Sequence, residues 1–315
     1  MWPPLPLSEW RDTYETLHRW TQIVGKIRMA CTPPVNHFWH VPLYVTARGL
    51  TTSPIPWRDG SFEIELDLVH HNLIVATDRD QVHAIPLIPR SVASFREELL
   101  ATLHALGIEP KFTDRPVEVP DTTPFSEDER HHAYDAHAAH RCWQVLASTD
   151  RVLKAFRGRF LGKASPVHFF WGSFDLALTF FSGRRAPAPP GAGPIEREAY
   201  SHEVASFGFW PGGVSARGVP MDEPIFYAYA VPEPEGFAEA PVRPAGASYH
   251  RALGEFVLPY EAVRRAPAPD AMLAEFFESA YENAATLGRW DRAALERTPE
   301  KAHRRDEVDR RIGPP

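Results

Sequence analysis

Histidines that neighbour aromatic residues are the side chains of this chain best suited to chemistry. The 315-residue sequence contains fifteen histidines, and His37, His168 and His202 fall in segments rich in aromatic and β-branched residues. Side chains alternate between the two faces of a strand, so histidines from different strands can meet on one face. Three converging imidazoles would bind a divalent metal and leave a coordination position open. These three are candidate metal ligands, with half-buried histidines bonded to the backbone as the alternative.

A second group of histidines, His131, His132, His137 and His140, lies in a predicted helix that follows residue 126. His137 and His140 are three residues apart, so they share a helix face and could reach one ion. Neither His137 nor His140 is preceded three residues earlier by the glutamate of a di-iron Glu-x-x-His helix. Histidines on a solvated helix surface explain this pattern more simply.

Carboxylates form another candidate constellation, which would perform acid/base chemistry. If the strands on both sides of the Pro/Gly-rich loop 182–194 pair as a hairpin, a register centred near Pro189 sets Asp175 opposite Glu203. Proximity would push the two pKa values apart, as a general acid and base require. A slip of one residue would remove the pair, and local capping or pairing of Asp175 is the alternative. The predicted catalytic residues are His168, Asp175, His202 and Glu203.

Aromatic residues cluster in sequence beside these histidines and carboxylates. A small-molecule pocket is mostly apolar with a few placed polar groups, so the pattern predicts an aromatic-walled pocket between two halves of the chain. The predicted ligand-binding residues are Trp39, Phe170, Trp171 and Trp210. We therefore expect a small-molecule enzyme or ligand-binding protein of unknown reaction. The alternative is a non-catalytic structural or interaction protein whose aromatic residues are core.

Composition restricts the partners and the compartment. The net charge of −7 and the dispersed basic residues argue against a nucleic-acid surface. No apolar run approaches the roughly 18 residues of a membrane span, and the N-terminus lacks the features of a signal peptide. Two distant cysteines, Cys31 and Cys142, provide neither a disulfide framework nor a cysteine zinc site. These features predict a cytoplasmic protein that binds neither membrane nor nucleic acid.

No familiar cofactor or catalytic motif is present. The sequence has no G-x-S-x-G elbow, no Walker loop, no G-x-G-x-x-G after a strand and no H-E-x-x-H. Its glycine-rich segments sit in loops with no following helix, which disfavours phosphate binding. The cofactor is therefore unknown, and a single divalent metal is the one candidate.

The elements that would position these residues predict an α+β protein. Residues 165–184 form the longest aromatic and β-branched run and predict a central strand. In a single strand, His168 would share a face with Phe170 and Phe174, and Asp175 would lie on the other face. The first half reads as a helix capped by Ser8, strands that begin with residues 37–47 and include the alternating run from Phe62, and a helix capped by Ser91 and ended by Gly107.

The second half repeats this order. Ser126 and Glu129 predict a capping box for a helix that extends to about Phe160. Four strands and a helix from Asp270 to Gly288 follow. We infer two helix–four-strand–helix halves, a probable internal duplication, that form antiparallel sheets with helices on one face. The predicted boundaries are 1–110 for the first half, 111–125 for the linker, 126–290 for the second half and 291–315 for a flexible charged tail.

Several long motifs support a family resemblance. The segments PPVNHFWHV, SPVHFFWGSFDLA and EAYSHEVASFGFWPG, with TLHRWTQIVGK and GLTTSPIP, resemble a bacterial family known only as a domain of unknown function. The resemblance covers most of the chain, from Trp2 to about Leu295. It implies a bacterial cytosolic protein, and it implies no activity, cofactor or catalytic residue.

Overall fold

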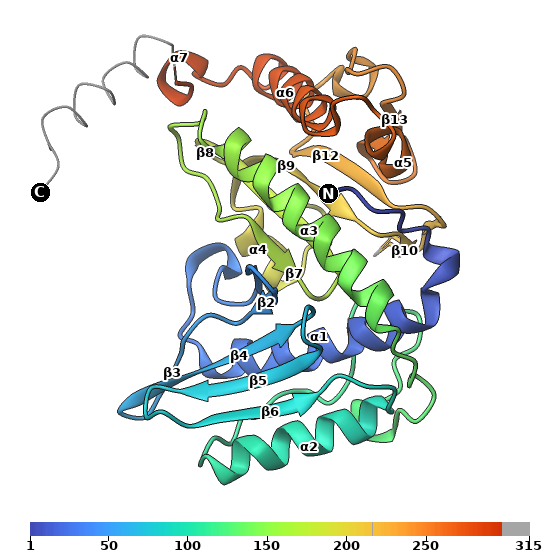
Figure 1. Cartoon of the computed structure of the whole chain (residues 1–315). Helices are drawn as coiled ribbons and strands as arrows, with labels where there is room; N and C mark the ends of the chain where they lie inside the picture. The colour runs from blue at the N-terminus through green and yellow to red at the C-terminus, as the bar shows by residue number, and fades with distance from the viewer. Residues whose placement is uncertain (216, 298–315) are drawn as a thin grey trace, which may run out of the picture.

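The computed structural model describes residues 1–215 and 217–297, which form two antiparallel sheets with helices packed against them (Figure 1). The predicted α+β class is confirmed. The helices of the described chain are α1 (Arg11–Cys31), α2 (Val92–Ala105), α3 (Ala136–Arg157), α4 (Pro194–Ala199), α5 (Tyr260–Arg264), α6 (Pro269–Leu287) and α7 (Arg292–Leu295). Short 3-10 turns are η1 (Leu7–Glu9), η2 (Asn36–Phe38), η3 (Phe125–Glu127) and η4 (Phe237–Glu239).

The first sheet contains six strands in place of the predicted four. They are β1 (Tyr44–Val45), β2 (Gly49–Thr51), β3 (Ile55–Trp57), β4 (Gly60–Asp67), β5 (Asn72–Thr77) and β6 (Val82–Pro86), in the order β1-β2-β4-β5-β6 with β3 also on β4. The alternation predicted from Phe62 is confirmed, since Phe62, Ile64 and Leu66 are buried. Strong local patterning therefore fixes which face of β4 meets the core.

Helix α2 has the ends that its sequence predicts. The Ser91 hydroxyl accepts a hydrogen bond from the Ser94 backbone N–H. Gly107, two residues beyond the helix, has a φ of 72°, a left-handed conformation that favours glycine. Ser8 and Ser126 do not cap helices: α1 begins at Arg11, and α3 begins at Ala136 with the Asp135 side chain as its cap.

The predicted strand at residues 37–47 is largely absent. His37 and Phe38 have φ values of 59° and 58°, which are left-handed and incompatible with an extended strand. The segment instead forms η2 and continues to the two-residue strand β1. His37 therefore lies on a tight turn rather than on a sheet.

The predicted central strand is also wrong in detail, because it is a hairpin. The strands β7 (His168–Phe170) and β8 (Asp175–Arg185) are joined by a turn in which Phe174 has a φ of 60°. The register pairs His168 with Ala177 and Phe170 with Asp175. Because cross-strand partners share a face, His168 lies on the same face as Asp175, contrary to the single-strand prediction.

The second sheet has the order β13-β14-β12-β9-β8-β7, and a separate hairpin lies beside it. Its other strands are β9 (His202–Trp210), β12 (Ile225–Val231), β13 (Ser248–His250) and β14 (Glu255–Pro259), and the hairpin is β10 (Gly213–Val214) with β11 (Pro220–Met221). Helices α3 and α6 cover one face (Figure 1). Phe156 of α3 lies 5.0 Å from the rings of Phe180 and Phe207 and 5.8 Å from Phe277 of α6.

The two sheets meet at a short seam. Leu43 and Phe169 exchange two backbone hydrogen bonds of 2.9 and 2.8 Å, which attach the first sheet to β7. Helix α1 contributes buried residues such as Trp20 and Ile23 to the main core cluster, which also contains residues of both sheets. The predicted linker has no helix or strand at residues 111–124.

The internal duplication is not confirmed. His37 lies on a turn and His168 on a strand, so the two similar segments adopt different structures. Of the predicted tail, residues 292–295 form α7, and residues 298–315 lie outside the described part of the chain. Among the described residues, no helix combines the length and the apolar character needed to cross a membrane.

Candidate functional site

The second sheet presents a polar face on the side opposite α3 and α6. The strand registers place cross-strand partners side by side, and alternation then assigns each residue to a face. We define the polar face by His168, Phe170, Asp175, Ala177, Thr179, Ser206, Gly208, Trp210, Tyr227, Tyr229 and Glu255. The opposite face is filled by phenylalanine and leucine, so the hydroxyl and carboxyl groups of this sheet concentrate on the polar face, beside apolar residues such as Ile225 and Val257.

The centre of the polar face is a hydrogen-bonded pair, Asp175 and Tyr227. The Tyr227 hydroxyl donates to Oδ2 of Asp175, and the Ser173 hydroxyl donates to Oδ1. Asp175 is 9% exposed and Tyr227 is 6% exposed. Burial raises the pKa of Asp175, and the two donated hydrogen bonds partly oppose that rise. The carboxyl group is therefore held in place but is not compensated by a cation.

A glycine allows the tyrosine to reach this carboxyl group. The Tyr227 ring lies over Gly208, where an added Cβ atom would collide with the Tyr227 hydroxyl and with the Leu176 carbonyl oxygen. Gly208 pairs with Ala177 on one side and with Tyr227 on the other. The small residues at the centre of the face thus make space for the phenol.

A row of hydroxyl groups lies beside this pair. Tyr229 stacks on Tyr227 with ring centroids 6.0 Å apart. Its hydroxyl lies 3.1 Å from the hydroxyl of Tyr200, which follows α4. On the neighbouring strands, the hydroxyls of Thr179 and Ser206 lie 3.0 Å apart. The face therefore offers several groups that both donate and accept hydrogen bonds.

Two further carboxyl groups, those of Glu255 and Glu118, lie close enough to Asp175 to be affected by its charge. Burial, and then the charge of Asp175, raises the pKa of Glu255 to about 7. Glu118 comes from the segment 111–124, and its side chain lies beside Gly172. Glu118 remains exposed to solvent, yet desolvation by surrounding protein, with the charges of Asp175 and Glu196, raises its pKa to about 7. Both carboxyl groups therefore change between the protonated and the ionised form near neutral pH.

The cluster has little positive charge to balance it. Arg217 lowers the pKa of Glu255, but its guanidinium donates to the Leu253 carbonyl oxygen rather than to a carboxylate. The charge of Asp175 consequently destabilises the ionised forms of Glu118 and Glu255. A group with a pKa near 7 can give or take a proton at physiological pH, as general acids and bases do.

His168 lies on the polar face but is sealed from solvent. The residue is 1% exposed, and its Nδ1 has no hydrogen-bond partner. Burial lowers the pKa of His168 to about 3, so the imidazole is neutral at physiological pH. The Phe170 ring is 4.5 Å away. This environment suits a packed neutral ring better than the catalytic base predicted from the sequence.

His168→Phe is expected to make the protein less sensitive to acid. The wild-type imidazole titrates near 6.5 when unfolded and near 3 when folded, so the unfolded state binds more protons between these values. Stability should fall by about 1.4 kcal/mol per pH unit there, or about 2 kcal/mol from pH 6.5 to 5. Urea unfolding at both pH values measures this loss, which the variant should lack.

The control for this experiment is His83→Phe, because His83 is exposed on β6. At neutral pH, His168→Phe should unfold within about 1 kcal/mol of the wild type, since the residue has no hydrogen bond to lose. An unchanged dependence on pH in His168→Phe would contradict a neutral buried imidazole.

The predicted Asp175–Glu203 pair does not form. The hairpin register sets Leu176 opposite Phe209, and a register shift lies between Phe181 and Arg185. Glu203 therefore lies at the far end of β9 from Asp175 and, by alternation, on the face toward α6. Arg184 forms an ion pair with Glu203 at 2.6 Å. The sequence of a long loop does not determine the register of the strands that it joins, so the predicted Asp175–Glu203 pair was wrong.

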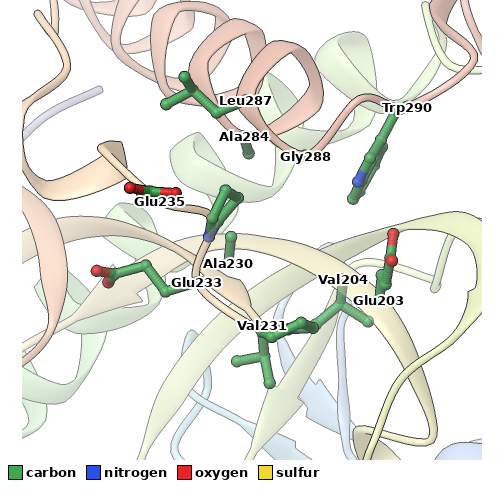
Figure 2. A pocket seen from close by; sticks show the side chains of 12 residues that line it. Glu203, Val204, Ala230, Val231, Glu233, Glu235, Ala284, Leu287, Gly288 and Trp290 are labelled. Atoms are coloured by element: carbon green, nitrogen blue, oxygen red, sulfur yellow. The ribbon is translucent and has the colours of Figure 1, made fainter.

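Glu203 instead borders a small pocket between the second sheet and the end of α6. Val204, Ala284 and Trp290 line the same pocket, which has a volume of about 160 Å³. Figure 2 shows Glu203 directed toward Trp290, with Leu287 and Ala284 of α6 above the sheet. This pocket contains none of the other predicted catalytic residues.

The three candidate metal ligands do not converge. The His37 and His202 rings lie 5.5 Å apart, and both are near the Phe181 end of β8. His168 pairs with Ala177, further along the strand. Among the described residues, no set of three histidine, cysteine or acidic side chains is arranged to hold a metal ion. The predicted three-histidine site is therefore not assembled.

The four predicted ligand-binding aromatic residues separate into different surroundings. Trp39 lies 5.9 Å from the Phe181 ring, and Phe170 pairs with Asp175 on the polar face. Trp171 is buried, and its Nε1 donates to the Val41 carbonyl oxygen. Trp210 donates to the Ser173 carbonyl oxygen beside Asp175. Phe170 and Trp210 thus border the Asp175 cluster, whereas Trp171 packs in the core.

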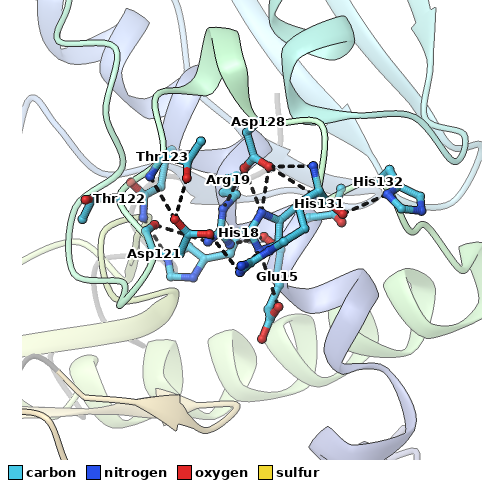
Figure 3. A network of polar contacts seen from close by, with 12 residues as sticks. Glu15, His18, Arg19, Asp121, Thr122, Thr123, Asp128, His131 and His132 are labelled. Carbon is cyan, nitrogen blue, oxygen red and sulfur yellow. Dashed lines mark hydrogen bonds and ion pairs between the residues drawn. The ribbon is translucent and has the colours of Figure 1, made fainter.

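A separate buried ion network fixes the segment that carries Glu118. Asp128 accepts hydrogen bonds from His131 Nδ1 at 2.8 Å, and it pairs with Arg19 Nε at 3.1 Å (Figure 3). Arg130 pairs with Asp121 at 2.8 Å. His131 therefore lies in a buried turn and not on the solvated helix predicted for it. These contacts tie residues 121–131 to α1.

Sequence reasoning missed Glu118, Glu255, Tyr227 and Tyr229. The alternation in IFYAYAV, with tyrosines two apart, is a local signal that both face one side of β12. Glu118 carries no such signal, since it reaches its neighbours from an irregular segment.

Comparisons with known proteins place the chain in a family without a known activity. Neither the curated proteins nor the solved structures provide a significant match. The model of a family of unknown function, DUF5996, matches residues 2–297. Because this match extends over nearly the whole described chain, the protein belongs to the DUF5996 family.

Proposed function

We propose that the chain is a small-molecule enzyme or ligand-binding protein whose site is the Asp175 cluster, meaning Asp175, Glu118, Glu255, Tyr227 and Tyr229. The observation that carries this proposal is that burial raises the pKa of all three carboxyl groups, and that the charge of Asp175 raises the pKa of Glu118 and Glu255 further. Among the described residues, Arg217 partly offsets the rise at Glu255. A cluster of this kind costs stability, so a role beyond folding is the simplest reason to keep it.

The electrostatics favour a ligand with a positive charge. A cation next to Glu118 and Glu255 would stabilise their ionised forms and lower their pKa values. The hydroxyl groups of Tyr200 and Tyr229 would orient hydroxyl or amino substituents of that ligand. Proton transfer would then use Glu118, which is the most accessible of the carboxyl groups, with Asp175 and Tyr227 holding the geometry.

Other features support a cytoplasmic protein with small-molecule partners. Both cysteines are free, as expected for a reducing compartment. The net charge of −7 disfavours nucleic acid as the partner. A bacterial origin rests on the family resemblance.

Thermal-shift measurements with organic amines and polyamines test this proposal. A cationic ligand should raise the melting temperature more at about pH 8 than at about pH 6, because Glu118 and Glu255 ionise between these values. Glu118→Gln and Glu255→Gln should each reduce the shift, whereas Glu97→Gln, an exposed change on α2, should not.

Two outcomes would count against the Asp175 cluster as the site. A shift that is equal at both pH values would exclude ionisation of these carboxyl groups from binding. A protein that responds to no amine or metabolite would favour a structural or interaction role instead.

A further inference from the structure

We propose that Lys163 is a nucleophilic amine that forms an imine with a small anionic aldehyde or ketone. This site is separate from the Asp175 cluster, and it goes beyond the function proposed for that cluster. It lies near the far end of β8, where the turn η2, the first residue of β9 and the segment between α3 and β7 come together.

The Lys163 amine is held against a histidine and two aromatic rings. Its Nζ lies 2.7 Å from His37 Nε2, 5.4 Å from the Trp39 ring and 5.1 Å from the Phe181 ring. The residue is exposed, so a small molecule can reach the amine. No carboxylate lies within ion-pair distance of Lys163 among the described residues, which leaves the amine free of a permanent counterion.

The backbone sets the tautomer of His37. Its Nδ1 lies 3.1 Å from the Glu198 carbonyl oxygen and 3.3 Å from that of Ala199. Both partners are acceptors, so Nδ1 must carry the proton and Nε2 must present its lone pair to Lys163. A carboxylate oxygen of Glu198 also accepts the backbone N–H of His37 at 3.1 Å. The left-handed turn at His37 therefore aims a base at the amine.

These contacts match the needs of imine formation. Desolvation lowers the pKa of Lys163, which increases the fraction of neutral amine. The Nζ lone pair attacks the carbonyl carbon while His37 Nε2 accepts a proton from Nζ. The carbonyl oxygen takes one proton from solvent to become the carbinolamine hydroxyl. The proton held by His37 then passes to that hydroxyl, which leaves as water and yields the iminium ion. Trp39 and Phe181 would stabilise that cation through their ring faces.

Neighbouring positive charge selects a carbonyl compound with an anionic group. Arg185 of β8 lies opposite His202 of β9 in the strand register, and the His202 ring lies 5.5 Å from that of His37. Burial, then the charges of Lys163 and Arg185, lower the pKa of His202, which places both cations near this ring. Arg185 is exposed and has no ion pair within the described chain. A carboxylate or phosphate group on the substrate would form an ion pair with Arg185.

Reductive trapping tests the proposal directly. The protein is incubated with glyoxylate, an anionic aldehyde, and cyanoborohydride near pH 7.5, and peptide mapping locates the secondary amine that results. The chain has five lysines, of which Lys111 and Lys154 provide exposed internal references. Lys163 should be labelled at least about tenfold faster than either reference, because His37 Nε2 gives its amine a general base that the references lack.

Matched variants separate the parts of the mechanism. Lys163→Arg should abolish the fast label, and His37→Gln should slow labelling of Lys163 without changing that of Lys111. Arg185→Gln should slow the reaction with glyoxylate but not with propionaldehyde, which is neutral. Melting curves of each variant verify that it is folded.

Equal labelling of Lys163, Lys111 and Lys154 would overturn the proposal. Fast labelling that does not depend on Arg185 would retain the reactive amine but overturn the anionic substrate class. Because Glu118→Gln leaves this end of β8 unchanged, either result is independent of the test of the Asp175 cluster.

Discussion

Asp128→Ala is expected to lower the free energy of unfolding by about 3–5 kcal/mol, because it leaves a buried charge without its partner. Asp128 is 1% exposed and Arg19 is 4% exposed. His131 also loses its Asp128 acceptor in this variant. Urea denaturation at neutral pH measures the loss.

The matched control removes an ion pair on the surface. Asp222 pairs with Arg11 at 3.2 Å, but its side chain is 88% exposed. Asp222→Ala should cost about 0–1 kcal/mol, because solvent screens the pair. Asp128→Asn should give an intermediate loss, since an amide oxygen can still accept the backbone N–H groups of Arg130 and His131. Equal stability of Asp128→Ala and Asp222→Ala would contradict a buried network.

Gly208→Ala should be the most damaging small change on the polar face. The added methyl group meets the Leu176 carbonyl oxygen and the Tyr227 ring, so either the strand or the ring must move. Overpacking costs about 1–3 kcal/mol. Displacement of Tyr227 removes a donor from buried Asp175, which adds about 1–3 kcal/mol. Thermal and urea unfolding should both show the loss.

Gly193→Ala is the control for this change, since no atom lies within 4 Å of the new methyl group and the φ of −72° suits alanine. Its effect should stay within about 1 kcal/mol. A Gly208→Ala variant as stable as Gly193→Ala would show that Tyr227 does not lie across this glycine.

Local signals predicted the elements whose ends are set by neighbours in sequence. Ser91 and Gly107 marked the ends of α2, and alternation from Phe62 fixed the inward face of β4. A glycine also predicted the end of α6, since Gly288 is its C-cap. In these cases a capping hydrogen bond or a repeat of two residues determines the outcome.

The candidate site was only partly predictable, because its geometry depends on turns and registers. The sequence drew attention to Asp175, and the structure places it at the centre of the polar face. A left-handed residue at Phe174 reversed the chain and moved His168 to the face of Asp175. The register after the loop 182–194 separated Glu203 from Asp175. Glu118 reaches the cluster through contacts distant in sequence, and no periodic pattern encodes them.

The seam between Leu43 and Phe169 also changes the exposure of the sheets to other molecules. The outer strands of two separate sheets would be β1, β3 and β6 of the first and β7 and β13 of the second, each with unpaired backbone groups that can recruit a strand from another chain. The seam joins the residue before β1 to β7, so the outer strands of the combined surface are β3, β6 and β13. β6 ends at Pro86, which lacks a backbone N–H, and β13 has three residues. Two hydrogen bonds thus help to protect this large β surface from intermolecular aggregation.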